Sequence, residues 1–220
     1  NQLHKNYSKI FLLVDNNTKK FCLPYFFKKI QSLADKTVLT IKAGESNKRL
    51  ETCREVWQKL SDMGGDRKSL LINLGGGVVS DLGGFVAAAF KRGIDFINIP
   101  TTLLSMVDAS IGGKTGVDLG GLKNQIGIIT NPELVVVDSF FLKTLPENEY
   151  RSGYAEMLKH GIIKDYKYFK NLIKYKSFEE NDIIHYIHDS VSIKNDVVKQ
   201  DPFEYNYRKI LNFGHTLGHA

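Results

Sequence analysis

The sequence predicts an α/β fold in its first part, built on a mostly parallel, Rossmann-like sheet, followed by the start of an all-α domain. Short apolar runs alternate with helical patterns through the first 145 residues. Several of these runs are apolar throughout, which is typical of strands buried on both faces of a parallel sheet. After LKTLPENEY the strand patterns stop. We therefore predict an α/β domain over residues 1–146 and an incomplete helical domain over residues 147–220.

The elements of this fold follow one another in a regular order. The predicted strands are KIFLLVD (9–15), KTVLTIKAG (36–44), SLLINLGGG (69–77), IDFINIP (94–100) and ELVVVDSF (133–140). Helical periodicity covers residues 25–34, 48–64 and 80–93 between them, and then residues 147–176 and 180–200, before LNFGHTLGHA opens another helix. In parallel α/β sheets, ligands bind beyond the carboxyl ends of the strands.

Composition and charge exclude several classes of protein. Of the 220 residues, 42% are hydrophobic and 25% are charged, as in ordinary globular chains. The net charge is +6, but the lysines are scattered, so we predict no nucleic-acid binding. No apolar run is long enough to cross a membrane, and the N-terminus lacks the layout of a signal peptide. Cys22 and Cys53 suggest no disulfide framework, and we expect a cytoplasmic protein.

Glycine is concentrated in one half of the predicted α/β domain. Twelve of the nineteen glycines fall between Gly75 and Gly127. Within this stretch, INLGGGVVSDLGGF follows a strand and opens a helix, an arrangement that presents bare N–H groups and a helix N-terminus to an anion. A tight turn without a ligand is the alternative. The concentration of glycines favours a ligand cleft, and a dinucleotide with its pyrophosphate fits best.

The segment IPTTLLSMVDASIGGKTGVD adds polar groups after the fourth predicted strand. The hydroxyls of Thr101 and Thr102 are suited to bonding a nicotinamide or a ribose. Asp108 and Lys114 are suited to proton transfer or to binding a polar substrate. A surface salt bridge between charged residues is the alternative interpretation.

Two helical motifs carry metal-binding or catalytic side chains. GYAEMLKHGII places Glu156 and Lys159 three residues apart, on one helix face. LNFGHTLGHA places His215 and His219 four apart, and such a pair with a distant glutamate is a workable zinc set. Two polar histidines without metal are the alternative. The remaining histidines, His4, His160, His185 and His188, are interpreted as structural or exposed.

Taken together, these motifs resemble those of the 3-dehydroquinate synthase family. GGGVVSDLGGF, PTTLLSMVDASIGGKTGVD, LKN, GYAEMLKHG and LNFGHTLGHA occur in the family's order and spacing, and the match runs from about Val14 to Ala220. The resemblance implies a cytoplasmic, homodimeric carbon–oxygen lyase of the shikimate pathway. Such an enzyme uses NAD and a divalent metal, zinc or cobalt, to convert 3-deoxy-D-arabino-heptulosonate 7-phosphate, a sugar-acid phosphate, to 3-dehydroquinate and phosphate.

The resemblance also implies roles for individual residues. NAD contacts would come from Asp15, Asn17, Glu45, Lys48, Gly75, Gly76, Gly77, Asp81, Thr101, Thr102, Phe141, Thr144, Leu145 and Glu149. Asp108, Lys114, Lys123 and Asn124 would line the cleft between NAD and substrate. Lys159, Lys194, Arg208 and Asn212 would bind substrate, and Arg92 would reach the substrate phosphate of a neighbouring subunit.

For the metal, the resemblance implies Glu156 and His215 as ligands and moves His219 to the substrate side. A third ligand would be a histidine beyond Ala220. We therefore expect residues 1–220 alone to bind NAD, to hold metal weakly and to show no turnover.

The sequence departs from the family pattern at a few positions. Leu122 stands where glycine usually precedes the lysine, Ile129 replaces a common aromatic residue, and Asn206-Tyr207 replaces Gly-Leu before Arg208. These changes bear on loop shape more than on chemistry. Three other functions remain open: a related sugar-phosphate cyclase, a glycerol-type metal-dependent dehydrogenase, and an NAD-binding module without catalysis.

Overall fold

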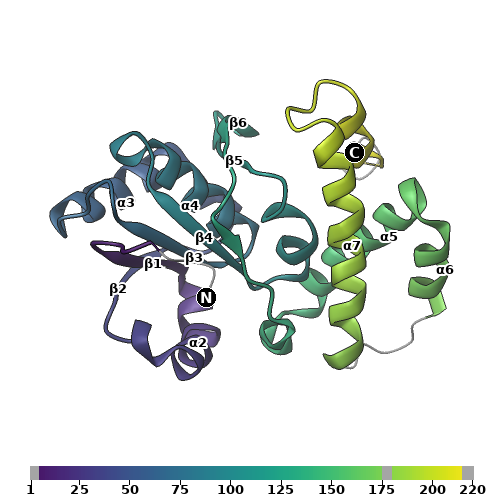
Figure 1. The fold of residues 1–220 in the computed structure, drawn as a ribbon, viewed down its shortest axis with the longest axis horizontal. Helices are drawn as coiled ribbons and strands as arrows, with labels where there is room; N and C mark the ends of the chain where they lie inside the picture. Colours follow the sequence, from purple (N-terminus) through teal and green to yellow (C-terminus); the bar gives the residue numbers. More distant parts are fainter. Residues whose placement is uncertain (1–4, 175–179, 215–220) are drawn as a thin grey trace. The chain divides into compact units, whose positions relative to one another are not determined.

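The chain divides into two compact units (Figure 1). The computed structural model describes residues 5–174 and 180–214. Unit 1 consists of residues 1–101 and 113–137, and unit 2 of residues 102–112 and 138–220. The predicted domain boundary near Pro146 stays a prediction, because the division by contacts falls at other positions and assigns residues 102–112 to the helical unit.

Unit 1 is built on a five-stranded parallel sheet. Its strands are β1 (Ile10–Asp15), β2 (Thr37–Ile41), β3 (Leu70–Gly75), β4 (Asp95–Pro100) and β7 (Leu134–Val135), in the order β2-β1-β3-β4-β7. Every neighbouring pair is parallel, so the predicted α/β fold is confirmed. The last strand is much shorter than predicted. Asp138 accepts a hydrogen bond from the Phe140 amide at 2.9 Å and starts a helical turn, η5 (Ser139–Thr144), inside the predicted strand.

The helices of unit 1 are α1 (Asn16–Phe21), α2 (Leu23–Lys29), α3 (Leu50–Asp62) and α4 (Gly77–Ala89), with short turns η1 (Gln31–Leu33), η2 (Glu45–Asn47) and η3 (Phe90–Arg92). The two longer helices, α3 and α4, start two and three residues from their predicted starts. The helix predicted over residues 25–34 ends at Lys29, because Ile30 leaves the helical conformation.

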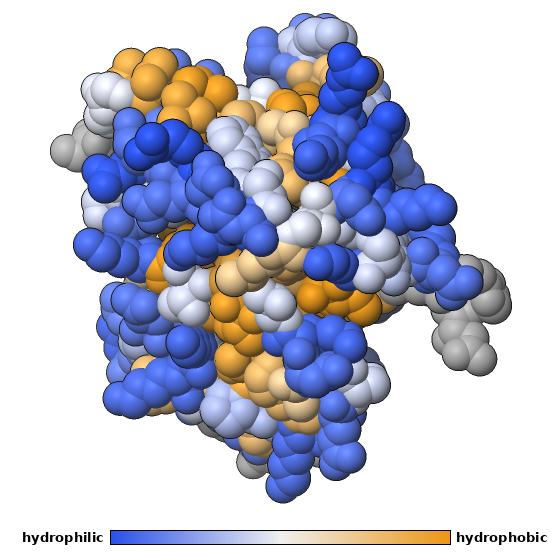
Figure 2. Space-filling view, turned by 90° about the vertical axis from the view of Figure 1, so that its left-hand side faces the viewer, coloured by the Kyte–Doolittle hydropathy of each residue, from blue (hydrophilic) through white to orange (hydrophobic). Residues whose placement is uncertain are grey.

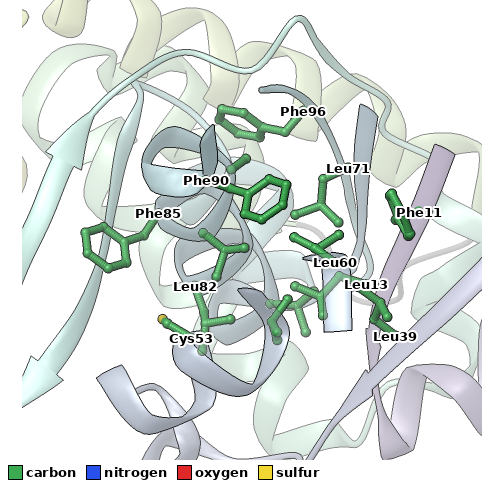
Figure 3. Close-up of a cluster of buried hydrophobic side chains, with 14 of the residues drawn as sticks. Phe11, Leu13, Leu39, Cys53, Leu60, Leu71, Leu82, Phe85, Phe90 and Phe96 are labelled. Atoms are coloured by element: carbon green, nitrogen blue, oxygen red, sulfur yellow. The ribbon is translucent and has the colours of Figure 1, made fainter. Parts of the chain in front are cut away.

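The core of unit 1 lies where α3 and α4 meet the strands (Figure 3). Phe11, Leu39, Leu60, Leu71 and Leu82 are nearly or completely buried there. Helix α4 approaches β3 closely at Gly83, where a Cβ atom would lie 2.1 Å from Oδ1 of Asn73. The Asn73 amide in turn donates to Oδ1 of Asn98 on β4 at 2.9 Å. Glycine is therefore required at position 83 for this helix to pack against the sheet.

A two-stranded antiparallel sheet completes unit 1, and the sequence did not predict it. Its strands are β5 (Lys114–Leu119) and β6 (Leu122–Ile129). Gly120 and Gly121 join them with φ of 58° and 84°, a turn that glycine makes without strain. Most side chains of β6 are exposed, so this strand shows no apolar alternation.

In the view of Figure 2, hydrophobic residues form separate areas among hydrophilic ones.

Unit 2 is helical, as predicted. Its helices are α5 (Glu147–Lys164), α6 (Tyr166–Lys174) and α7 (Glu180–Gln200), and α5 packs on both α6 and α7. Two shorter turns are η4 (Ser105–Ala109), which is π-helical, and η6 (Tyr207–Asn212). The helix predicted over residues 147–176 is split because Asp165 is extended and its Oδ1 accepts from the Tyr168 amide at 2.9 Å. No helix in the described ranges is both long and apolar enough to cross a bilayer.

Candidate functional site

In unit 1 the carboxyl ends of the central strands meet at one edge of the sheet. Asp15 pairs with Ile41, and Gly75 pairs with Pro100, so four strands end side by side. Asp15 also caps α1 by accepting from the Thr18 amide at 2.7 Å. The residues implied for NAD that follow these strand ends are Asn17, Glu45, Lys48, Gly76, Gly77, Asp81 and Thr101. The fold thus brings them to the edge where parallel sheets bind ligands.

The glycine turn between β3 and α4 has the predicted strand–turn–helix form. Gly76 is the N-cap of α4, and no described side chain caps that helix end. The first N–H groups of α4 are therefore not used by a side-chain cap. Together with the positive end of the helix dipole, they suit a phosphate group.

Lys48 is the centre of a charged network in unit 1. Its side chain is only 4% exposed, and its Nζ lies 2.8 Å from Glu45, 3.5 Å from Asp81 and 3.7 Å from Asp118. It also donates to Oδ1 of Asn124 at 2.9 Å. Burial works against the charge, but the hydrogen bond to Glu45 and the nearby carboxylates outweigh it and raise the pKa of Lys48. The network therefore keeps Lys48 charged.

Asp118 belongs to this network although the sequence analysis gave it no role. Its Oδ1 accepts from the Asn124 amide at 2.8 Å, and its own amide donates to the Lys48 carbonyl oxygen at 2.8 Å. The first contact holds Asn124 at a φ of 54°, which asparagine tolerates better than most residues. Asp118 stands within the motif SIGGKTGVD, but nothing in the pattern distinguished it from a solvated acid.

An open pocket of about 400 Å³ lies beside the network. Glu45, Lys48, Asp118 and Lys123 line it together with the Gly120–Gly121 turn, and Nζ of Lys123 lies 3.9 Å from Glu45. The volume is within the range of small-molecule sites. Lys114 is exposed at the start of β5, and Arg92 is exposed after α4 with a φ of 70°.

In unit 2, helix α5 presents Glu156, Lys159 and His160 together. Nζ of Lys159 lies 2.5 Å from Oε1 of Glu156 and donates to the carbonyl oxygen of Leu211 at 2.5 Å. The expected placement of Glu156 and Lys159 on one helix face is confirmed. Both side chains are 11% exposed, so this pair is largely shielded from solvent.

Asp108, on η4, forms an ion pair with Lys194 of α7. Nζ of Lys194, which is almost fully buried, also donates to the Asp108 carbonyl oxygen at 2.5 Å. Burial alone would raise the pKa of Asp108, but the charges of Lys194, Lys159 and His160 lower it to about 2. The structure thus gives Asp108 an ion-pair partner on α7, Lys194, which the sequence analysis had not linked to it.

His160 joins this group, which the sequence analysis did not foresee. It is fully buried, its Nδ1 lies 2.7 Å from Oγ of Ser190, and its Nε2 lies 3.2 Å from Oε1 of Glu156. One ligand atom each from Asp108, Glu156 and His160 lie within 4.8 Å of one another. The available signal was the four-residue spacing from Glu156. His185 and His188 are exposed, as expected, while His4, His215 and His219 lie outside the described residues.

The metal-ligand role implied for Glu156 is compatible with its surroundings. Its Oε1 is buried and has no aligned hydrogen-bond donor among the described residues, although Lys159 and His160 approach it. A carboxylate oxygen in this position suits a divalent cation, and imidazole nitrogen is the other ligand type that zinc prefers. The donor set around Glu156 therefore fits such an ion.

Arg208 carries a buried positive charge. It is 2% exposed, and its guanidinium donates to the carbonyl oxygens of Pro202 at 2.7 Å and Gly112 at 2.9 Å. Its Nε has no hydrogen-bond partner, and within the described ranges its hydrogen bonds go to main-chain oxygens rather than to a carboxylate. Desolvation lowers the pKa of Arg208, against the opposing charges of Asp108 and Asp201. Such a group favours an incoming anion.

The other substrate and NAD residues of unit 2 differ in their burial. Nδ2 of Asn212, an exposed residue, donates to Oε1 of Glu204 at 3.1 Å, and the Thr102 hydroxyl bonds the Ser105 hydroxyl at 2.9 Å. Phe141 is buried, and Thr144, Leu145 and Glu149 lie at the end of η5 and the start of α5. The replacement of glycine by Asn206 needs no left-handed backbone, because its φ is −142°.

Two family models cover most of the chain. The model of the 3-dehydroquinate synthase N-terminal part matches residues 38–152, and that of the C-terminal part matches residues 153–220. The chain belongs to the 3-dehydroquinate synthase family. A relative named 3-dehydroquinate synthase, from Parabacteroides distasonis, is 44% identical over 220 residues. The match covers 97% of this chain and 61% of the relative, so the chain spans about three fifths of the relative's length.

Solved structures with a similar fold support this assignment. A 2-deoxy-scyllo-inosose synthase complexed with carbaglucose-6-phosphate, NAD⁺ and Co²⁺ superposes with a TM-score of 0.87 at 25% identity, covering 97% of this chain and 60% of that one. The 2-epi-5-epi-valiolone synthase ValA from Streptomyces hygroscopicus, with NAD⁺ and Zn²⁺ bound, has a TM-score of 0.81 at 28% identity and covers 94% and 59%.

Proposed function

We propose that the protein acts as a 3-dehydroquinate synthase, which converts 3-deoxy-D-arabino-heptulosonate 7-phosphate to 3-dehydroquinate and phosphate. The observation that carries the proposal, in a chain of this family, is the buried Arg208 guanidinium without a carboxylate partner. A substrate with both a phosphate and a carboxylate needs several cations at one site. Lys159, Lys194 and Arg208 supply them from a single unit.

NAD and a divalent metal, zinc or cobalt, are the cofactors that we propose. The uncapped start of α4 suits the NAD pyrophosphate, and the network of Glu45, Lys48, Asp81 and Asn124 suits its polar groups. Glu156 would hold the metal together with His215. When bound, NAD supplies a hydride acceptor and donor, and the metal supplies a Lewis acid.

The residues of unit 2 would bind and orient the substrate. Arg208 and Lys159 offer N–H donors to its anionic groups, while Asp108 holds Lys194 through two hydrogen bonds. In the overall reaction, the carbon–oxygen bond to phosphate breaks, a carbon–carbon bond closes the ring, and the elements of phosphoric acid leave. No net oxidation occurs, so the chain has only to place the groups and shield them from water.

We also propose a cytoplasmic homodimer in which Arg92 reaches the partner's substrate. Lys91 and Arg92 both have left-handed backbone, with φ of 51° and 70°, and both side chains are exposed after α4. Mixing Arg92→Ala with Lys159→Ala protein should restore part of the activity, because each mixed dimer keeps one intact site. If subunits exchange and no activity returns, Arg92 does not act across subunits.

The decisive experiment is a turnover assay on the full-length gene product. Phosphate release from 3-deoxy-D-arabino-heptulosonate 7-phosphate should require NAD and should stop after exhaustive chelation. Glu156→Gln should abolish turnover without changing the far-ultraviolet circular dichroism. Turnover of glucose 6-phosphate would instead favour a related cyclase, and oxidation of glycerol a dehydrogenase. Binding of NAD with no turnover of any of these would indicate a non-catalytic module.

A further inference from the structure

We propose that Asp201 is a positioning residue for substrate binding, and that it acts by fixing the loop that carries Arg208. The inference rests on the proposed function, because Arg208 is taken to bind the anionic substrate. Asp201 directly follows the last residue of α7 and is 9% exposed. No motif in the sequence analysis assigned it a role.

The Asp201 carboxylate organises the backbone of the following seven residues. Its Oδ1 accepts from the Tyr205 amide at 2.9 Å, and its Oδ2 accepts from the amides of Asn206 at 2.8 Å and Arg208 at 3.0 Å. Burial raises the pKa of Asp201, but these three hydrogen bonds, together with the nearby charge of Arg208, outweigh it and lower the pKa. The carboxylate therefore fixes the start of η6, where Arg208 stands.

The far end of Arg208 is held by main-chain oxygens. The guanidinium donates to the carbonyls of Pro202 and Gly112. Gly112 has a φ of 91°, and a Cβ there would lie 2.6 Å from Nη2 of Arg208. Position 112 must therefore be glycine for the guanidinium to occupy this place.

This arrangement holds the arginine without pairing its charge. The Asp201 oxygens accept from main-chain amides, and within the described residues the guanidinium donates hydrogen bonds to main-chain carbonyls. An acid that formed an ion pair with Arg208 would compete with an anionic substrate. Asp201 acts on Arg208 through space by its charge, but its hydrogen bonds go to the backbone, so it fixes the side chain and leaves the N–H groups at the ligand side without an ion pair.

The size of the effect follows from the geometry. Asp201→Ala removes all three hydrogen bonds and lets the backbone at Arg208 move, and a displacement of about 1 Å at a binding group costs on the order of 100-fold in rate. We expect a 10- to 100-fold loss of kcat/KM for the heptulosonate phosphate, carried mainly by KM. Asp201→Asn keeps one acceptor oxygen and should lose less.

The test compares six forms of the full-length protein: wild type, Asp201→Ala, Asp201→Asn, Arg208→Ala, the Asp201→Ala/Arg208→Ala double variant, and Lys209→Ala. Lys209 is an exposed cation next to Arg208 and serves as the matched control, expected to stay near wild type. The readouts are kcat and KM, the Kd for inorganic phosphate by calorimetry, the Kd for NAD, and the melting temperature.

If Asp201 acts through Arg208, the double variant binds phosphate and turns over substrate no worse than Arg208→Ala alone. NAD affinity should be unchanged in all six forms. Additive losses in the double variant, or a loss for Asp201→Ala that follows its melting temperature alone, would overturn the proposal.

The two hypotheses fail in different ways. If the wild-type protein binds phosphate but does not turn over the heptulosonate phosphate, the proposed function is refuted. The phosphate Kd values of the variants then still test the role of Asp201. Wild type that neither turns over the substrate nor binds phosphate refutes both.

Discussion

Replacing Lys48 by methionine should destabilise the protein and weaken NAD binding together. Methionine keeps the length of the side chain but removes the charge. The substitution removes the hydrogen bonds from Nζ to Glu45 and Asn124 and leaves three carboxylates within 4 Å of an uncharged group. A hydrogen bond that involves a charged group contributes about 1.5–3 kcal/mol.

Solvent reduces the cost of leaving each carboxylate unpaired, and by different amounts. Glu45 is 40% exposed and regains much of its hydration, whereas Asp81 and Asp118 are about half as exposed, at 20% and 19%. Breaking a fully buried pair costs about 3–5 kcal/mol, so we expect the lower end, about 3 kcal/mol. For a chain of this length, that corresponds to a fall of about 10 °C in melting temperature.

The assay is thermal unfolding of Lys48→Met at low and high salt, with NAD calorimetry beside it. Lys42→Met, an exposed lysine in the same segment after β2, is the matched control and should stay within about 0.5 kcal/mol of wild type. Adding Asp118→Asn to Lys48→Met should recover part of the loss, because one of the three like charges is removed. A Lys48→Met protein as stable as the control would show that the network has no net stabilising effect.

Three further predictions test other parts of the structure. Gly83→Ala should destabilise by about 2–4 kcal/mol in urea unfolding because its Cβ would displace Asn73, and Asn73→Ala in the same chain should recover part of this. Asp81→Ala should raise the NAD Kd at least tenfold in calorimetry without changing phosphate binding. Because the pKa of Asp108 is lowered to about 2, its ionised carboxylate stabilises the fold at neutral pH. This stabilisation is lost as the pH falls from 4 toward 2, so the difference in free energy of unfolding between wild type and Asp108→Asn should become smaller over that range.

The parallel sheet was predictable because its strands are buried on both faces and read as continuous apolar runs. All six residues of β3, for example, are buried, and the predicted run over 69–77 contains it. The hairpin of β5 and β6 was missed for the opposite reason, since Leu122, Ile128 and Ile129 are exposed and no alternation marks the strand. A strand that is mostly solvated leaves no hydrophobic period in the sequence.

The candidate site likewise has contacts that the sequence predicts and contacts that it does not. The spacing of Glu156 and Lys159 on one helix was enough to place them together. The contact between Asp108 and Lys194 spans 86 positions, and no local pattern contains it. Asp118 accepts from an amide of β6 and Asp201 from amides of the segment after α7, and the sequence does not show the backbone course of either segment. His160 stands four residues after Glu156, which places the two on one helix face. The sequence does not show, however, that the His160 ring is buried and lies against Oγ of Ser190.

The path of the chain between its units limits how the protein can be divided. The chain passes from unit 1 to unit 2 after Thr101, returns at Gly113 and leaves again after Val137. No single cut therefore leaves both units whole: one made near residue 146 would keep all of unit 1 but leave the helices without the segment that carries Asp108. If a single crossover joined the first part of one relative to the helical part of another, unit 2 would contain segments from both proteins. We expect such chimeras to fold poorly unless residues 102–112 are exchanged with the helices.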